Sequence, residues 1–183
     1  MNYKRWIFVA ISLFGIGLVL GLATPTSAAD LLSEDIAALE KLANFLASLP
    51  LALVVVIIFM KNVSALLISF ILSPILCLAP VMALTVNGWL LGFISVMVSQ
   101  EKSVGFVLAG LLPHGIFELP ALILGEAAAL SFGAVVILAL FKKERRSLLL
   151  PSLKQNLRYL MVALTLLLPA AIIETYVTPL LLT

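Results

Sequence analysis

Long apolar runs follow one another along almost the whole chain, with only short polar breaks between them. An α-helix needs about 20 predominantly apolar residues to cross the hydrocarbon core of a bilayer. Of the 183 residues, 63% are hydrophobic and 11% are charged, and the mean hydropathy is +1.26. A soluble domain carries about 25% charged residues. The sequence therefore predicts an integral membrane protein that is embedded in the lipid bilayer. We expect no nucleic-acid partner.

The apolar runs are continuous and lack the apolar/polar alternation of a membrane β-barrel strand. We therefore expect an all-α fold, a polytopic transmembrane helical bundle with 5–7 membrane segments, some short or broken, in a single domain over 1–183. The candidate segments are 6–22, 46–60, 64–84, 86–99, 104–124, 126–141 and 159–182. Two adjacent short segments could instead form a re-entrant hairpin. Whether 104–141 is two full spans or such a pair is left open.

The N-terminal region divides into an anchor over 1–22 and an external segment over 23–49. The apolar run of the anchor is longer than the roughly 7–15 residues of a signal-peptide core. This length favours an uncleaved anchor, although the small residues Ser27-Ala28-Ala29 leave a cleaved signal peptide as the alternative. The external segment predicts an amphipathic helix on the membrane surface. Its acidic residues are Asp30, Glu34, Asp35 and Glu40, and its apolar face is Leu32, Ile36, Leu39, Phe45 and Leu46.

Basic residues gather in the loop that we predict over 142–158, between the helical core at 50–141 and a last membrane helix at 159–183. Cytoplasmic loops carry an excess of Lys and Arg. We therefore expect this loop and the N-terminus to be cytoplasmic, with an even number of crossings between them. Basic side chains at the membrane surface also attract anionic lipid headgroups. The candidates for that contact are Lys142, Lys143, Arg145 and Arg146.

The core carries few polar residues, and the only histidine of the chain is among them, in "PHGIFELP" at 113–120. His114 and Glu118 are four residues apart and share one face of a helix. Pro113 suits the first turn of a helix and Pro120 ends or kinks one. The segment therefore predicts a broken or half helix inside the bundle. Small residues there, among them Gly115, would let neighbouring backbones approach.

Three interpretations of the His114/Glu118 pair remain open. The first is a buried hydrogen-bonded pair that fixes helix packing, with Asn62, Asn87 or Glu174 as partners. The second is a proton- or ion-handling site, because histidine titrates near neutral pH. The third, metal-dependent hydrolysis, is the weakest, because a catalytic zinc site usually has three protein ligands and the chain has one histidine. We therefore predict no catalytic residue, no metal and no cofactor.

Two asparagines lie where we expect apolar segments to end. Asn62 follows Lys61, and Asn87 is followed by Gly88, a strong turn signal. Their simplest interpretation is helix-end chemistry, and the alternative is a polar lining shared with His114. The single cysteine, Cys77, lies in an apolar run and reads as a small hydrophobic residue.

These motifs together resemble the stage II sporulation protein M family of membrane proteins. The matching features are "FMKN" ending at Asn62, Asn87-Gly88, "PHGIFELPA" at 113–121 and "IIETYVTP" at 172–179. The Pro-His-Gly-x-x-Glu motif is the specific element, formed here by Pro113, His114, Gly115 and Glu118. One departure is Lys61, because members often carry paired asparagines at this position.

The resemblance implies a polytopic membrane protein that acts through partners. The namesake works during engulfment with two peptidoglycan-degrading enzymes, as their membrane anchor and scaffold, and members also occur in organisms that do not sporulate. We therefore expect a non-enzymatic scaffold or membrane-remodelling component that assembles with membrane or envelope proteins. Faces of small residues permit a homodimer. The competing hypothesis is a small ion- or proton-coupled channel or transporter that uses His114 and Glu118.

Overall fold

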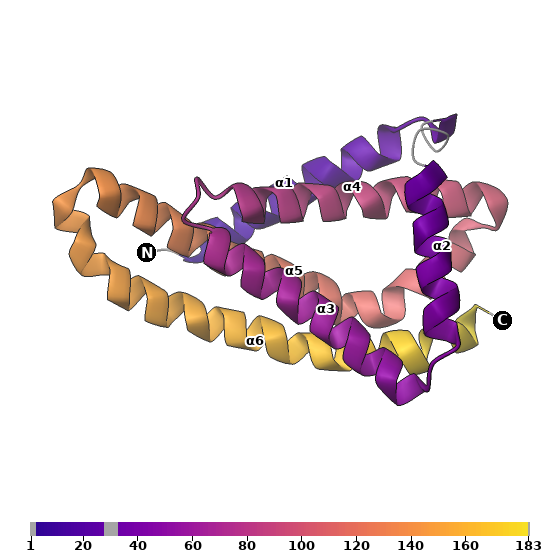
Figure 1. Ribbon diagram of the computed structural model, residues 1–183. Helices are drawn as coiled ribbons and strands as arrows, with labels where there is room; N and C mark the ends of the chain where they lie inside the picture. The colour runs from indigo at the N-terminus through magenta and orange to yellow at the C-terminus, as the bar shows by residue number, and fades with distance from the viewer. Residues whose placement is uncertain (1–2, 28–32, 183) are drawn as a thin grey trace.

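The computed structural model describes residues 3–27 and 33–182, and no β-strand occurs among them (Figure 1). The helices are α1 (Tyr3–Ala23), α2 (Ser33–Ala47), α3 (Leu51–Leu72), α4 (Leu78–Glu101), α5 (Val104–Phe141) and α6 (Leu149–Tyr176). Two short 3-10 helices, η2 (Lys143–Leu148) and η3 (Thr178–Leu181), flank α6. Within the described residues five candidate membrane spans are found, one for each helix except α2. The predicted all-α bundle of membrane segments is confirmed.

The spans form two groups that meet at one end of the molecule (Figure 1). Helices α1 and α4 pack along each other, while α3, α5 and α6 form the second group. Successive spans run in opposite directions, so that the start of α1, the turn between α3 and α4, and η2 lie at one end. Helix α2, the link between α4 and α5, and η3 lie at the other.

The boundaries of α3 and α4 differ from those that we predicted. Helix α3 continues through Lys61-Asn62 and α4 continues through Asn87-Gly88, so the helix-end interpretation of these residues is wrong. The chain instead turns at 73–77, where Pro74 follows the end of α3 and Leu76 and Cys77 adopt positive φ angles. In lipid the backbone polar groups are best satisfied inside a helix. Isolated polar side chains therefore do not end these helices.

Helix α5 replaces the two segments that we predicted on either side of Gly125-Glu126. It runs for 38 residues without a break and contains both Pro113 and Pro120. At 1.5 Å per residue it is roughly 57 Å long, and it changes direction in its first half (Figure 1). Proline is the usual cause of such a bend. The broken or half helix, the pair of full spans and the re-entrant pair are therefore all wrong.

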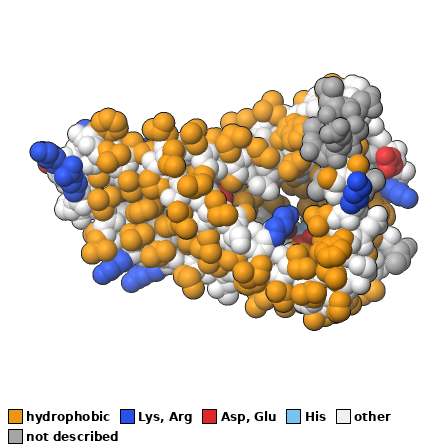
Figure 2. Space-filling view, in the orientation of Figure 1, with side chains coloured by type: hydrophobic (Ala, Val, Ile, Leu, Met, Phe, Trp, Pro, Cys, Tyr) orange, Lys and Arg blue, Asp and Glu red, His pale blue; other side chains and the backbone are white. Residues whose placement is uncertain are grey.

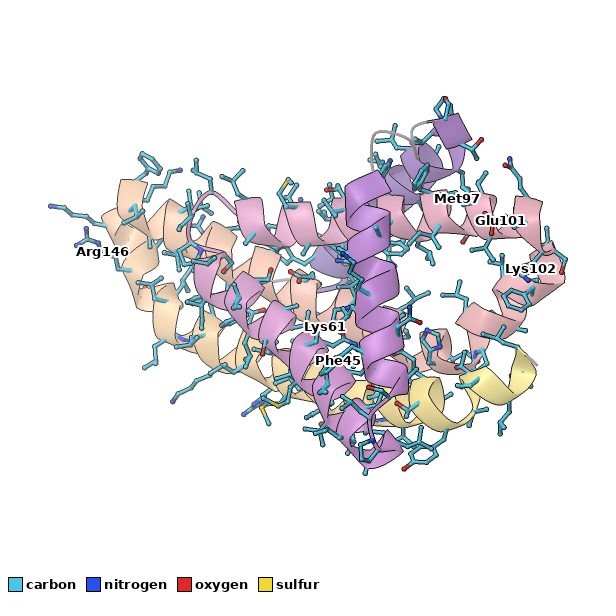
Figure 3. The ribbon with its side chains drawn as sticks, turned by 45° about the vertical axis from the view of Figure 1, so that its right-hand side comes forward. Phe45, Lys61, Met97, Glu101, Lys102 and Arg146 are labelled. Atoms are coloured by element: carbon cyan, nitrogen blue, oxygen red, sulfur yellow. The ribbon has the colours of Figure 1, made fainter. Side chains whose placement is uncertain are left out.

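The predicted basic loop over 142–158 is also shorter than expected, because α6 begins at Leu149 and Pro151 lies in its first turn. Among the described residues before the loop there are four membrane-length helices, α1, α3, α4 and α5, an even number as predicted. Figure 3 shows Arg146 at one end of the bundle and Glu101 and Lys102 at the other. In Figure 2 the first of these ends is marked by a group of basic side chains.

Glycines allow α1 and α4 to pack at close range. Gly17 and Gly21 of α1 and Gly88 and Gly92 of α4 face each other, and a Cβ atom at any of them would fall within 3.0 Å of the backbone of the opposite helix. Each pair has the small-xxx-small spacing of close transmembrane packing. Gly88 therefore serves helix packing, and the turn that Asn-Gly predicted is wrong. Gly115 is buried, but a Cβ there would meet only a side chain of its own helix, at 3.7 Å.

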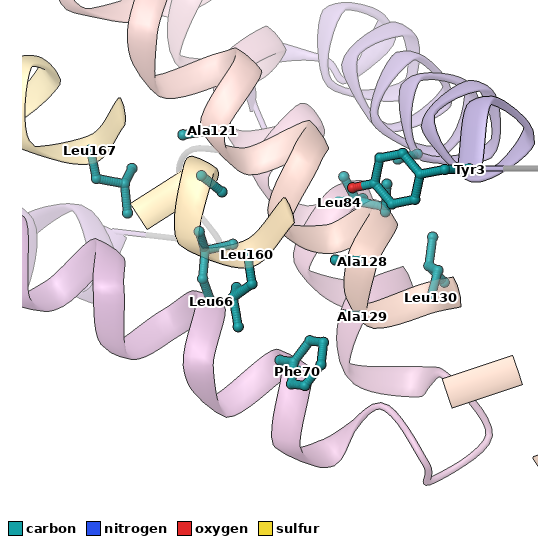
Figure 4. Packing of buried hydrophobic residues seen from close by; sticks show 13 residues of the cluster. Tyr3, Leu66, Phe70, Leu84, Ala121, Ala128, Ala129, Leu130, Leu160 and Leu167 are labelled. Carbon is teal, nitrogen blue, oxygen red and sulfur yellow. The ribbon is translucent and has the colours of Figure 1, made fainter. Parts of the chain in front are cut away.

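The core lies along the second half of α5. Ala127, Ala128 and Ala129 are fully buried, and Figure 4 shows Leu66 of α3 and Leu160 of α6 gathered beside this stretch. At the basic end Tyr3 of α1 donates a hydrogen bond to the backbone carbonyl of Leu124, at 2.7 Å, and its ring stacks on Tyr159 of α6. Aromatic contacts thus tie α1 to both α5 and α6.

Helix α2 spans the end of the bundle opposite the basic loop (Figures 1 and 3). The segment over 23–49, which we predicted to be external, contains a helix at Ser33–Ala47, and its place outside the cell stays a prediction. Phe45 is largely exposed, as expected of the apolar face of a surface helix. Residues 28–32, with most of the predicted cleavage site, lie outside the described residues. The same holds for the side chains of Glu34, Asp35, Ile36, Leu39 and Glu40.

The packing of α1 on α4 predicts different outcomes for two glycines of α1. Replacing Gly17 by Ala should lower the free energy of unfolding in detergent by about 1–3 kcal/mol, because the new methyl group collides with backbone of α4. Gly15 is the matched control, since a Cβ there meets nothing within 4 Å. Equal stability of the Gly17→Ala and Gly15→Ala proteins would contradict this packing.

Candidate polar site

The Pro-His-Gly-x-x-Glu motif lies within α5, on its bent first half. The Nε2 atom of His114 is 3.7 Å from Oε2 of Glu118, as their spacing on one helix face predicts. The His114 side chain is 13% exposed and that of Glu118 is 34% exposed. Both side chains are therefore partly shielded and still reachable from outside the bundle.

Three further residues surround this pair, and they come from different parts of the chain. Asn62 of α3 donates a hydrogen bond from Nδ2 to Oε1 of Glu118, at 3.3 Å. Thr178, the first residue of η3, places Oγ1 3.2 Å from Nδ1 of His114. Glu174 of α6 brings a carboxylate oxygen within 4.8 Å of the other two ligand atoms. The contacts therefore link α5 to α3 and to the end of α6.

We name His114, Glu118, Glu174, Asn62 and Thr178 the polar cluster. Figure 2 shows a hollow near α2 where a basic and an acidic side chain come together among hydrophobic ones. Lys61 of α3 is exposed and acts electrostatically on Glu174. The cluster therefore lies at a half-open site on an otherwise apolar surface.

Asn87 lies on α4, across the cavity between α4 and α5 from His114. Its Nδ2 donates to the backbone carbonyl of Ala83, at 2.7 Å, so its hydrogen bond stays within its own helix. A cavity of about 350 Å³ lies between α4 and α5. Its lining is mainly apolar, but Asn87 and His114 also border it. A smaller cavity of about 70 Å³ is bordered by Asn62, Asn87, Glu118 and Glu126 together with apolar residues. Asn87 thus shares the polar lining, as the alternative interpretation expected, without pairing with the cluster.

A second buried polar contact, which we did not predict, involves Glu126, the first residue of the predicted segment 126–141. Glu126 is 1% exposed and accepts a hydrogen bond from Ser69 of α3. The residues lie on different helices, so no local spacing marks the pair. The signal that could have found it is a single carboxylate inside an apolar run, because such a group is rare in lipid without a partner.

The basic residues proposed for lipid headgroups lie far from this cluster. Lys142, Lys143, Arg145 and Arg146 are all exposed, in and before η2. Arg146 places Nε 3.4 Å from the carbonyl oxygen of Ala139, near the end of α5. The four side chains are available to the membrane surface, and their role with lipid stays a prediction.

The fold brings two carboxylates close to the only histidine, and carboxylates can also bind a metal ion. His114, Glu118 and Glu174 could hold a metal ion with one nitrogen and two carboxylate oxygens. We predicted no metal because the chain has a single histidine, and that expectation stays a prediction. Glu174 joins the other two only through the packing of α6 on α5.

The fold and the cluster define a multi-pass helical membrane protein with an interior polar motif. The chain belongs to the stage II sporulation protein M family, which matches residues 10–179. It is also similar to the uncharacterized protein MJ0793 of Methanocaldococcus jannaschii, with 33% identity over 92 residues. This alignment covers 50% of the chain and 50% of the relative, so it spans about half the length of each. No solved structure matches the chain.

The Ser69–Glu126 contact predicts a specific loss of stability. Replacing Ser69 by Ala should lower the free energy of unfolding in detergent by about 1–3 kcal/mol, because the buried Glu126 carboxyl loses its partner. Ser64, exposed on the same helix, provides the control variant Ser64→Ala. Thermal unfolding of the two proteins would measure the difference, and an equally stable Ser69→Ala protein would refute the assignment.

Proposed function

We propose that this protein is a non-enzymatic membrane scaffold, and that its polar cluster holds α3, α5 and α6 in the arrangement that partners recognise. The supporting observation is that Glu118 and His114, the two ionisable residues of the motif, contact side chains from other parts of the bundle. Asn62 reaches Glu118, and His114 reaches Thr178. Interior polar side chains in membrane helices commonly serve as cross-links of this kind.

The shape of the bundle favours this role. The bent first half of α5, which carries His114 and Glu118, lies toward the end near α2, where α4 diverges from the group of α3, α5 and α6 (Figure 1). The contacts of the polar cluster fix how this half of α5 sits on α6. A change in these contacts would alter the surface around the cavity of about 350 Å³ between α4 and α5. A membrane or envelope protein that recognises this end would therefore depend on the cluster without touching its side chains.

The first experiment compares the partners recovered by wild-type protein and by a His114→Ala/Glu118→Ala protein. Tagged protein is crosslinked in its native membranes, purified by affinity and analysed by mass spectrometry. We expect the wild type to recover a stoichiometric membrane or envelope protein and the double variant to lose most of it, because α5 is no longer held on α3 and α6.

The matched control is Leu112→Ala/Ile116→Ala, which changes two lipid-exposed residues on the same stretch of α5. It should retain the partner. Normal recovery by the His114→Ala/Glu118→Ala protein would contradict the scaffold role of the cluster. Wild-type protein that is well folded and comes out alone would favour the competing channel or transporter, whose test is pH-dependent flux in reconstituted vesicles.

The proposed orientation places the N-terminus and the basic loop in the cytoplasm of the cell. The charge asymmetry supports it, because exposed Lys and Arg side chains gather around η2. The opposite end of the bundle, with Lys102 and α2, then faces outward. In this orientation the polar cluster lies toward the outer surface, where envelope proteins would be met.

Single-cysteine labelling tests the orientation. In a Cys77→Ser background, Lys102→Cys should react with a membrane-impermeant maleimide added to intact cells, because its link between α4 and α5 is external. Ser147→Cys, exposed in η2, should react only after the membrane is permeabilised. The reverse pattern would overturn the orientation.

A further inference from the structure

We propose that His114, Glu118 and Glu174 bind one divalent transition-metal cation of the Zn²⁺ class. One ligand atom of each residue lies within 4.8 Å of those of the others, and all three residues are half-buried. They come from two helices, α5 and α6, so a bound cation would join them. This inference adds a ligand to the cluster proposed above as a cross-link, and metal binding by purified protein can be tested without any partner.

The first argument is the hydrogen-bond state of His114. The hydroxyl of Thr178 is placed to donate to the backbone carbonyl of Ile173, at 3.3 Å. Its oxygen is then left to accept a hydrogen bond from Nδ1 of His114, which lies 3.2 Å away. In this arrangement the imidazole proton is on Nδ1, and Nε2 carries a lone pair. Metal-bound histidines usually donate their second ring N–H to an oxygen in this way.

The second argument is the set of groups that Nε2 faces. Oε1 of Glu118 accepts from Asn62, which leaves Oε2 directed toward Nε2, at 3.7 Å. This separation is too long for a hydrogen bond. A lone pair and two carboxylates that converge repel one another unless a proton or a metal cation lies between them, and a cation can be shared by all three. Ligands at 2.0–2.2 Å from a tetrahedral zinc are about 3.3–3.6 Å apart, so small side-chain movements would close the site.

The ligand chemistry selects the class of cation. Imidazole suits Zn²⁺ and other transition metals, whereas Mg²⁺ and Ca²⁺ prefer sites made only of oxygen. Three protein ligands leave a fourth position on zinc for water. The cavity of about 350 Å³ that His114 borders provides a route to the site. The positive charge of Lys61 disfavours a bound cation, because this exposed side chain of α3 interacts electrostatically with Glu174.

The experiment uses the full chain without a polyhistidine tag, purified in detergent and stripped with a chelator. Equilibrium dialysis against Zn²⁺, followed by elemental analysis, measures the number of ions per chain and the Kd. We expect one Zn²⁺ per wild-type chain and at least tenfold weaker binding by the His114→Gln and Glu174→Gln proteins. Mg²⁺ should not compete at equal concentration.

Control variants separate ligands from other zinc-binding groups. Glu101→Gln removes an exposed carboxylate on α4, and Cys77→Ser removes the only thiol; both should bind zinc as the wild type does. Thr178 is a positioning residue, because its hydroxyl oxygen orients His114. The Thr178→Val variant keeps the side-chain shape but removes that oxygen. It should weaken binding about 10–100-fold, as changes to such outer partners do.

The Lys61→Gln protein is expected to change zinc affinity in the opposite direction from the ligand variants. Removing this positive charge should tighten zinc binding, while loss of fold would weaken it. A ligand variant that fails to fold therefore does not decide the matter alone. Absence of stoichiometric zinc on wild-type protein, or equal binding by the wild type and the folded ligand variants, would overturn the metal site and leave the scaffold role to its own test.

Discussion

The packing of α5 against α3 and α6 is the interaction on which the other parts of the structure depend. Its buried alanines let both helices approach, and its polar residues then accept hydrogen bonds from α3 at two levels, Glu126 from Ser69 and Glu118 from Asn62. In lipid, apolar side chains gain little by leaving the solvent for each other. Close fit and hydrogen bonds therefore decide which helices pair, and α5 supplies both.

The sequence reasoning was right where it relied on the physics of the bilayer. Apolar length predicted membrane helices, and an even number of spans precedes the basic loop. It was wrong where rules from soluble proteins were applied to single residues. Lys61-Asn62, Asn87-Gly88 and Gly125-Glu126 would end helices in water, where exposed backbone can bond to solvent. In lipid that alternative is lost, and the chain turns at 73–77, where Leu76 and Cys77 adopt positive φ angles.

The candidate site was only partly predictable for a related reason. His114 and Glu118 meet because a helix repeats every 3.6 residues, and this periodicity can be read from any sequence. Glu174 and Thr178 reach His114 only after the chain has passed through η2 and α6 has returned along α5. Glu174 was predicted as an interior partner and Thr178 was not, because no spacing could show which atoms would meet. The contact between Thr178 and Nδ1 is the detail from which we infer that Nε2 of His114 is free.

The two proposals for the polar cluster rest on the same geometry and differ in what supplies the binding energy. Hydrogen bonds between membrane helices contribute on average about 0.6 kcal/mol each, so Asn62–Glu118 and His114–Thr178 alone would hold the bent half of α5 weakly. Each ligand added to a cation would bind α5 and α6 to the same centre. A weak cross-link suits a scaffold that must change shape, and a metal would make that change dependent on the cation. The free energy with which the cluster holds α5 on α6 therefore determines whether this end of the bundle is rigid or can change shape.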